Sequence, residues 1–251
     1  MKTMAYAALP LVALSVSAAA QGAWPVIALP QETKPFELGG QISVNGMPMR
    51  MQGFVSGADP GRLAAWFRQS LGQPLVESAL GPKIILGRLQ GEYYVTVQLE
   101  PAASGTRGLI GMTDLKAAHA NERATQAARA RWLARLPSGS RLLSQMESDD
   151  AGKHGTHLVI VNQHGAQLNR DQLTSLMGDD GMALERAVGA GELAGALAGA
   201  PAGAPWRAPP ANGTTLFYKG GGKEAMAVIS RDASGQTTIV LNTGTRSERA
   251  K

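Results

Sequence analysis

Residues 41–56 read QISVNGMPMRMQGFVS, and this stretch decides the fold prediction because it holds two strand-like runs around one tight turn. Residues 41–44 alternate polar and apolar side chains, as a half-buried strand does. Asn45-Gly46 is a strong hairpin turn signal. Residues 49–56 form the second run, and Pro48 stands just before its paired part. The stretch therefore predicts two antiparallel strands joined by a short turn.

A helix is predicted directly after this hairpin. Asp59 is a favourable N-cap residue, and Pro60 suits the first helical position. Large apolar residues then follow at helical spacing and share one face, which assigns Trp66 and Phe67 to the core. The full apolar set is Leu63, Trp66, Phe67 and Leu71. Gly72 is expected to end the helix.

Three further strand-like runs complete the first half of the chain. They cover residues 84–89, 93–99 and 107–112, and Gln90-Gly91 is the turn between the first two. The order of elements over residues 41–115 is therefore ββαβββ.

The second half of the chain, residues 140–244, gives the same order. Strands are predicted at 141–147, 157–162, 214–218, 225–230 and 237–241, and a helix from an N-cap at Asn169 through Met177. Residues 149–155 are predicted to be a polar loop. Gly220-Gly221-Gly222 and residues 233–235 are the expected turns between the last three strands.

The predicted fold class is α+β, with two tandem ββαβββ units joined by a basic Ala/Arg-rich helix. Each unit is expected to have a largely antiparallel sheet covered by one helix, because a helix with one apolar stripe needs a sheet face to cover it. A unit of this size is near the lower limit of independent stability, which favours packing of the two halves against each other.

Residues 1–20 are predicted to be a secretory signal peptide. Lys2 supplies the positive charge, residues 5–16 are largely apolar, and Ala18-Ala19-Ala20 offers small residues for cleavage. The alternative is an uncleaved N-terminal anchor, for which the apolar run is short. The expected location is periplasmic or secreted, without stable membrane insertion after cleavage.

The remaining segments are predicted to be irregular or solvated. Residues 21–40 are an extended lead-in with three prolines, residues 187–211 are a loop rich in Ala, Gly and Pro, and residues 245–251 are a tail. Residues 116–139 form the connecting helix and linker.

The connecting helix carries a basic cluster. Arg129, Arg131 and Arg135 lie near Trp132, and arginine beside an aromatic ring can grip an anionic lipid or nucleic acid. The apolar face is too narrow for a membrane helix, so a solvated linker is favoured. The export signal argues against nucleic acid as a partner.

The composition excludes several classes of protein. The chain has 251 residues, no cysteine, and a formal charge of +5 from 24 Lys+Arg and 19 Asp+Glu. Disulfide scaffolds, cysteine nucleophiles and cysteine-ligated metal sites are therefore ruled out. An apolar fraction of 44% is too high for a wholly disordered protein.

Three histidines lie close together in the sequence and are candidate metal ligands. His157 and His164 should sit near opposite ends of the strand at 157–162, and His154 lies before it. A strand rises about 3.3 Å per residue, so the three are expected to be separate surface histidines. The sequence assigns no metal site.

Other motifs resemble catalytic signatures only superficially. Lys219-Gly-Gly-Gly-Lys223 lacks the spacing of a phosphate loop and fits a hairpin turn. The acid pairs Asp149-Asp150 and Asp179-Asp180 lie in predicted loops and are expected to be solvated. Ser138-Gly-Ser140 is ordinary turn chemistry. No catalytic or cofactor-binding residue is assigned.

These observations predict an exported, non-enzymatic protein-binding or scaffold component, for example of an envelope assembly or secretion complex, with an envelope protein as partner. The alternative is a periplasmic binding module for a small anionic or glycan ligand held between the halves. A hydrolase with unidentified acid and base residues is the weaker alternative.

Overall fold

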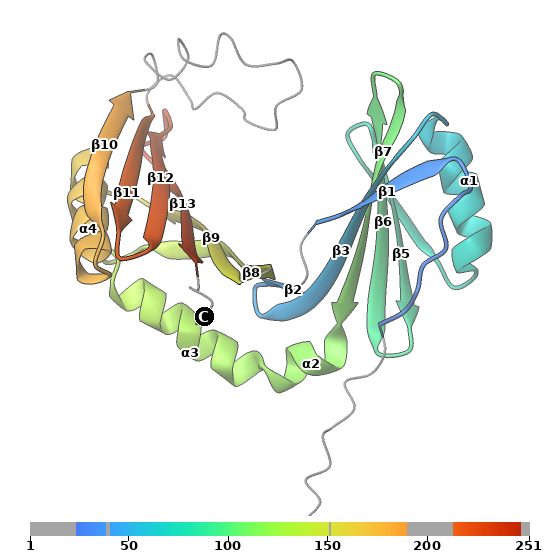
Figure 1. The fold of residues 1–251 in the computed structure, drawn as a ribbon, viewed down its shortest axis with the longest axis horizontal. Helices are drawn as coiled ribbons and strands as arrows, with labels where there is room; N and C mark the ends of the chain where they lie inside the picture. The colour runs from blue at the N-terminus through green and yellow to red at the C-terminus, as the bar shows by residue number, and fades with distance from the viewer. Residues whose placement is uncertain (1–23, 39–40, 151, 190–212, 247–251) are drawn as a thin grey trace, which may run out of the picture.

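The computed structural model describes residues 24–38, 41–150, 152–189 and 213–246 (Figure 1). The predicted signal peptide, most of the predicted 187–211 loop and most of the predicted tail lie outside the described residues. Within the described part, no helix has the length and apolar character needed to cross a membrane.

The first half of the chain holds seven strands and one helix. The helix is α1 (Pro60–Leu71), and the strands are β1 (Thr33–Glu37), β2 (Gln41–Val44), β3 (Met47–Ser56), β4 (Val76–Leu80), β5 (Lys83–Gln90), β6 (Tyr93–Ala102) and β7 (Gly105–Asp114).

The second half holds six strands and one helix, and two helices connect the halves. The connecting helices are α2 (Leu115–Ala120) and α3 (Glu122–Ala134). The others are β8 (Arg141–Asp150), β9 (Lys153–Asn162), α4 (Ala166–Asp179), β10 (Ala183–Gly189), β11 (Thr214–Gly220), β12 (Lys223–Arg231) and β13 (Thr237–Arg246).

All of these strands belong to one antiparallel sheet, so the prediction of two separate helix-covered sheets is wrong. The order is β10-β11-β12-β13-β9-β8-β2-β3-β7-β6-β5-β4, and β1 pairs with β3 beyond the end of β2. The structure is mostly sheet, with 53% of residues in strands and four helices in the described part. The division into units at 41–115 and 140–244 stays a prediction.

The two expected sheets merge because β2 pairs with β8 from Gln41↔Asp149 to Val44↔Met146. Asn45 fixes this junction: its backbone N–H donates to the Gln145 carbonyl at 2.7 Å, and its side-chain Oδ1 accepts from the Gln145 N–H at 3.0 Å. Unpaired edge strands expose backbone groups that need partners, and here two edges satisfy each other.

Several elements differ from their predicted bounds. The lead-in contains β1, and β4 and β10 extend the two ends of the sheet. The predicted loop at 149–155 is largely part of the β8–β9 hairpin. The single connecting helix is broken at Asn121 into α2 and α3.

The helix predicted to start after Asn169 instead begins one turn earlier, at Ala166, with Gly165 as its N-cap. Asn169 is fully buried inside this helix. Its side-chain Nδ2 donates to the carbonyls of Gly165 and His164, and its amide exchanges hydrogen bonds of 2.8 and 3.1 Å with Asn162. A buried amide needs such partners, and Asn169 finds them inside the core rather than at the helix end.

Two separate hydrophobic cores lie on one face of the sheet. In the first half, α1 buries Leu63, Ala64, Phe67 and Leu71 against strand residues such as Phe54 and Leu99, which confirms the assignment of Phe67 to the core. Trp66 is partly buried against the same cluster. In the second half, α4 packs Leu173, Leu176 and Met177 against residues of β8, β9 and β11–β13.

The connecting helices bury none of their residues fully, although Trp132 and Leu133 of α3 pack against the second core. Figure 1 shows α1 and α4 on the outer sides of the two ends of the sheet, with α2 and α3 along its junction. The other face of the sheet is the inner one, and no described helix covers it. We call it the helix-free face.

Candidate functional site

The helix-free face carries most of the exposed large apolar side chains of the described residues. Successive strand residues point to opposite faces, so the neighbours of the core residues in β3–β7 point away from α1. Register places six of the eleven exposed large apolar residues there: Phe36, Met47, Val55, Val76, Leu80 and Leu89. Exposed apolar side chains gathered on one face are a common feature of interaction sites.

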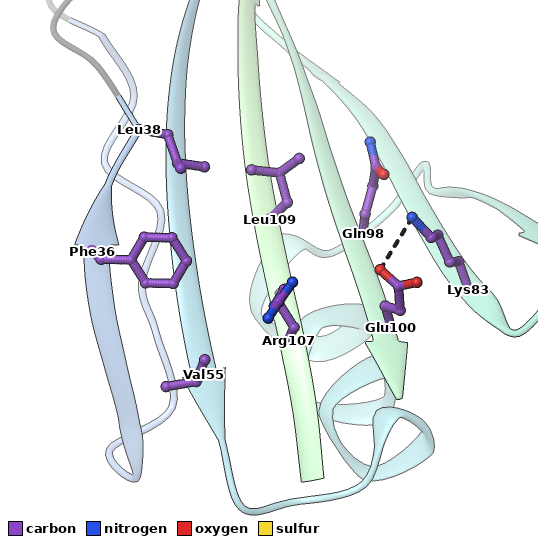
Figure 2. A pocket seen from close by; sticks show the side chains of 9 residues that line it. Phe36, Leu38, Val55, Lys83, Gln98, Glu100, Arg107 and Leu109 are labelled. Carbon is purple, nitrogen blue, oxygen red and sulfur yellow. Dashed lines mark ion pairs between the residues drawn. The ribbon is translucent and has the colours of Figure 1, made fainter. Parts of the chain in front are cut away.

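A hollow of about 430 Å³ lies on this face in the first half (Figure 2). Its apolar lining is Phe36, Leu38, Val55 and Leu109, and its polar lining is Lys83, Gln98, Glu100 and Arg107. Figure 2 shows these side chains coming from neighbouring strands β1, β3, β7, β6 and β5. We call this site the Arg107 hollow.

Two glycines shape the hollow. Phe36 lies across β3 at Gly53, where any Cβ would overlap the ring. Behind the hollow, Gly108 lies against the buried ring of Phe54, and a Cβ there would overlap that ring too. The missing side chains therefore let one ring cover each side of the sheet.

The charges of the hollow are not balanced. Lys83 Nζ and Glu100 Oε2 form an ion pair at 3.1 Å, drawn as a dashed line in Figure 2. Arg107 lies opposite Glu100 in register, yet no hydrogen bond or ion pair joins its guanidinium to another residue that the structure describes. The hollow therefore presents one cation that no carboxylate neutralises.

The helix-free face continues into the second half with a more polar row. His157, Asn242, Met226 and Phe217 are cross-strand neighbours in β9, β13, β12 and β11. Arg186 of β10 ends the row, with its guanidinium carbon 4.9 Å from the centre of the Phe217 ring. This contact is a cation–π interaction, so the Arg186 guanidinium already has a partner on this face.

The structure keeps the three histidines apart. His154 Nδ1 lies 2.9 Å from Asp149 Oδ1, His157 Nδ1 lies 2.7 Å from Asn242 Oδ1, and His164 Nε2 lies 2.7 Å from the Ser138 carbonyl. Within the described residues, no group of three His, Asp or Glu side chains is placed to hold a metal ion.

The glycine motif is a hairpin turn, as predicted. Gly221 and Gly222 join β11 to β12 with φ of 55° and 70°, a left-handed conformation that favours glycine in two-residue hairpin turns. Lys223 Nζ donates to the Asp180 carbonyl at 3.1 Å.

The acid pairs and serines do not form a shared site. Asp180 forms an ion pair of 2.9 Å with Arg135, whereas Asp149 lies at the β8–β9 turn beside His154. Ser140 donates its N–H to the Pro137 carbonyl, and its hydroxyl accepts from Asn162. These contacts are structural in kind.

Two of the three arginines in the basic cluster of the connecting helix are used for packing, whereas Arg131 is exposed. Arg129 donates to the Leu142 carbonyl, and Arg135 donates to the Leu176 carbonyl at 3.1 Å as well as pairing with Asp180. The Arg135 guanidinium also lies over the Trp132 ring at 5.9 Å. Both arginines therefore fasten α3 to the second half.

The Arg107 hollow was missed at the level of sequence. Phe36 and Leu38 belong to the lead-in, which gives no strand signal because Pro30 and Pro35 interrupt it. The strand predicted at 107–112 includes Arg107, but the neighbours of Arg107 across the sheet depend on the register with β3 and β6, which spacing alone does not provide.

Local contacts shift the pKa of groups in both halves of the sheet. The hydrogen-bonded Arg68 guanidinium lowers the pKa of Glu77, and burial raises the pKa of the Tyr218 phenol. The Ser234 hydroxyl and the backbone N–H groups of Ser234 and Gln236 lower the pKa of Asp232. All three groups serve local structure.

No protein-family model and no curated protein matches the chain. Among solved structures, a chain of "The crystal structure of Tle4-Tli4 complex" is similar over 90% of this chain and 84% of its own, at 12% identity and a TM-score of 0.29. The apo structure of immunity protein TplEi of the T6SS from Pseudomonas aeruginosa is similar over 89% of this chain and 85% of its own, at 11% identity and a TM-score of 0.26. Likeness at this level carries no conclusion about fold or function.

Proposed function

We propose that this chain is an exported, non-enzymatic protein that binds a partner protein across its helix-free face. The observation that carries the proposal is the exposure of that face: Val76 and Leu80 at one end are 63% and 67% exposed, and Val55 further along is 42% exposed. Contact between this apolar area and water is unfavourable, so covering the area with a partner protein lowers the free energy.

The shape of the face supports a macromolecular partner. It runs over strands from both halves of the sheet, and the Arg107 hollow is a shallow part of it rather than an enclosed cavity. A standard protein interface buries about 800 Å² on each side, an area that a broad sheet face provides and a single small ligand does not use.

The expected place of action is the periplasm or the cell exterior, and it rests on the predicted signal at residues 1–20.

The test uses crosslinking in native envelopes followed by identification of the linked protein. Wild-type protein should capture one stoichiometric partner, and Val76→Asp with Leu80→Asp should reduce capture at least tenfold. Leu168→Asp is the matched control, because Leu168 is 48% exposed on α4, away from the helix-free face. Equal capture by all three proteins would count against the proposal.

The alternative of a small anionic ligand has one supporting feature in the second half. A hollow of about 520 Å³ beside the β11–β12 turn is lined by Lys153, Lys219 and Lys223. However, Glu224 shares this hollow, and Lys223 already bonds Asp180. Titration with inorganic phosphate should leave the amide signals of Gly221 and Gly222 in place; saturable shifts there would favour this alternative.

A further inference from the structure

A single row of side chains crosses five strands and passes through the Arg107 hollow. Lys34, Val55, Arg107 and Glu100 are cross-strand neighbours in β1, β3, β7 and β6, and Lys83 of β5 pairs with Glu100. The row holds three cations and one carboxylate. Since Lys83 neutralises Glu100, the charges that remain are those of Lys34 and Arg107.

The next row of side chains is apolar. Phe36 covers Gly53, and Leu109 is the neighbour of Gly53 on β7. Arg107 and Leu109 project from the same strand on the same face, so the guanidinium stands at the border of an apolar floor (Figure 2). A guanidinium offers a planar fork of donors that matches a carboxylate in two parallel hydrogen bonds.

We propose that the Arg107 hollow receives an acidic side chain of the partner protein, with a neighbouring apolar side chain of that partner seated on Phe36 and Leu109. The inference rests on the proposed function and names the chemistry of the partner: an aspartate or glutamate beside an apolar residue. Covering the floor removes water from the ion pair, which strengthens the attraction.

The charges of the row favour a carboxylate over a phosphate group. Lys34 is not among the residues that line the hollow, so one carboxylate balances Arg107 there, whereas a dianion would also meet Glu100 on the neighbouring strand. The apolar floor likewise fits a protein side chain better than a sugar or nucleotide, which would leave polar groups unpaired there.

The experiment compares Arg107→Gln with wild-type protein in capture of the crosslinked partner and in direct binding once that partner is purified. Arg107 is exposed, so the variant should fold normally, which circular dichroism checks. Binding should weaken at least tenfold. Arg62→Gln is the control, because Arg62 is an exposed arginine on α1, on the opposite face.

The acidic residue itself is found by charge exchange. Arg107→Glu should abolish binding, and replacing one acidic residue of the partner by lysine should restore it at least tenfold. Failure of every acidic-to-lysine change to restore binding would overturn the proposal.

The outcomes separate the two proposals. If Val76→Asp with Leu80→Asp abolishes capture but Arg107→Gln does not, the face binds a partner and the acidic anchor is wrong. If neither changes capture, the proposed function itself fails. A third outcome is that the wild-type chain forms a concentration-dependent dimer and Arg107→Gln does not. A second copy of this chain would then occupy the hollow, which would overturn the inference.

Discussion

At the scale of single residues, Gly108 has no space for a side chain within the first core. A Cβ there would overlap the ring of Phe54, which is fully buried and lies 5.8 Å from the Phe67 ring centre. Because the interior is close-packed, Phe54 has no free volume to move into.

Gly108→Ala should therefore lower the free energy of unfolding by about 1–3 kcal/mol, the usual range for overpacking a core. Urea unfolding followed by circular dichroism measures this change. Gly57→Ala is the matched control, because a Cβ at Gly57 meets no atom within 4 Å. Equal midpoints for the two variants would contradict the packing argument.

Tyr218 is a second residue with a measurable consequence. Burial raises its pKa, and its hydroxyl lies 3.2 Å from Thr174 Oγ1. A raised pKa in the folded state means that the neutral phenol stabilises the fold below the ordinary pKa of 10.0, and this stability is lost as pH rises through the higher folded value.

Absorbance at 295 nm should show a tyrosine that ionises above pH 10.0, and Tyr218→Phe should remove that late step. Above pH 10.0, the free energy of unfolding of the variant should also fall less steeply with rising pH than that of wild-type protein. A late step that survives in Tyr218→Phe would assign it to another tyrosine.

At the scale of elements, local signals predicted most of the strands and α1. The Asp59 cap, with its side chain accepting from the Arg62 N–H at 3.0 Å, and the Asn45-Gly46 turn are both where the sequence places them. These elements depend on neighbours in the chain, which a sequence displays directly.

Elements that depend on distant partners were missed. β1 forms only because β3 offers an edge beyond the end of β2, and α4 starts before Asn169 because Asn162 supplies a buried partner. For the same reason the Arg107 hollow was not foreseen: its parts come together only through the register of five strands.

Besides its pairing with β5, the edge strand β4 has an exposed ion pair with α1. Arg68 of α1 donates from Nε and Nη2 to the two carboxylate oxygens of Glu77 at 2.9 and 2.6 Å, and this bonding lowers the Glu77 pKa. A lowered pKa means that the contact stabilises β4 above the ordinary pKa of 4.5 and is lost as pH falls through the lower folded value.

Glu77→Gln should speed amide hydrogen exchange in β4 at neutral pH, several-fold at most, because exposed ion pairs contribute little. Glu185→Gln is the control, since Glu185 is an exposed carboxylate on β10, the opposite edge of the sheet. Unchanged exchange in β4 would show that strand pairing with β5 alone fixes this edge.

At the scale of the whole molecule, the two cores are joined by little structure. β2 contributes four pairs to β8, and α2 and α3 bury no residue fully. Ser43 faces Pro48 on β3, and Pro48 has no N–H to donate, so the Ser43 backbone groups point to β8.

Ser43→Pro should therefore weaken the β2–β8 junction while leaving the β2–β3 pairing in place. Hydrogen exchange in increasing urea should then show two unfolding units, one for each core, with midpoints further apart than in wild-type protein. Ser43→Thr keeps the N–H and should behave as wild type. A single shared midpoint in Ser43→Pro would show that the cores depend on each other by another route.

The position of β13 has a consequence for how the chain matures. It is the last strand along the chain within the described residues, yet it lies between β9 and β12. As the chain is synthesised from its N-terminus, all the strands of the first half are present once residue 114 has been made, whereas β9 and β12 lack the strand that joins them until residue 246 has been made. During that delay β9 and β12 present unpaired edges, which makes the late stage of synthesis the one that most favours misassembly.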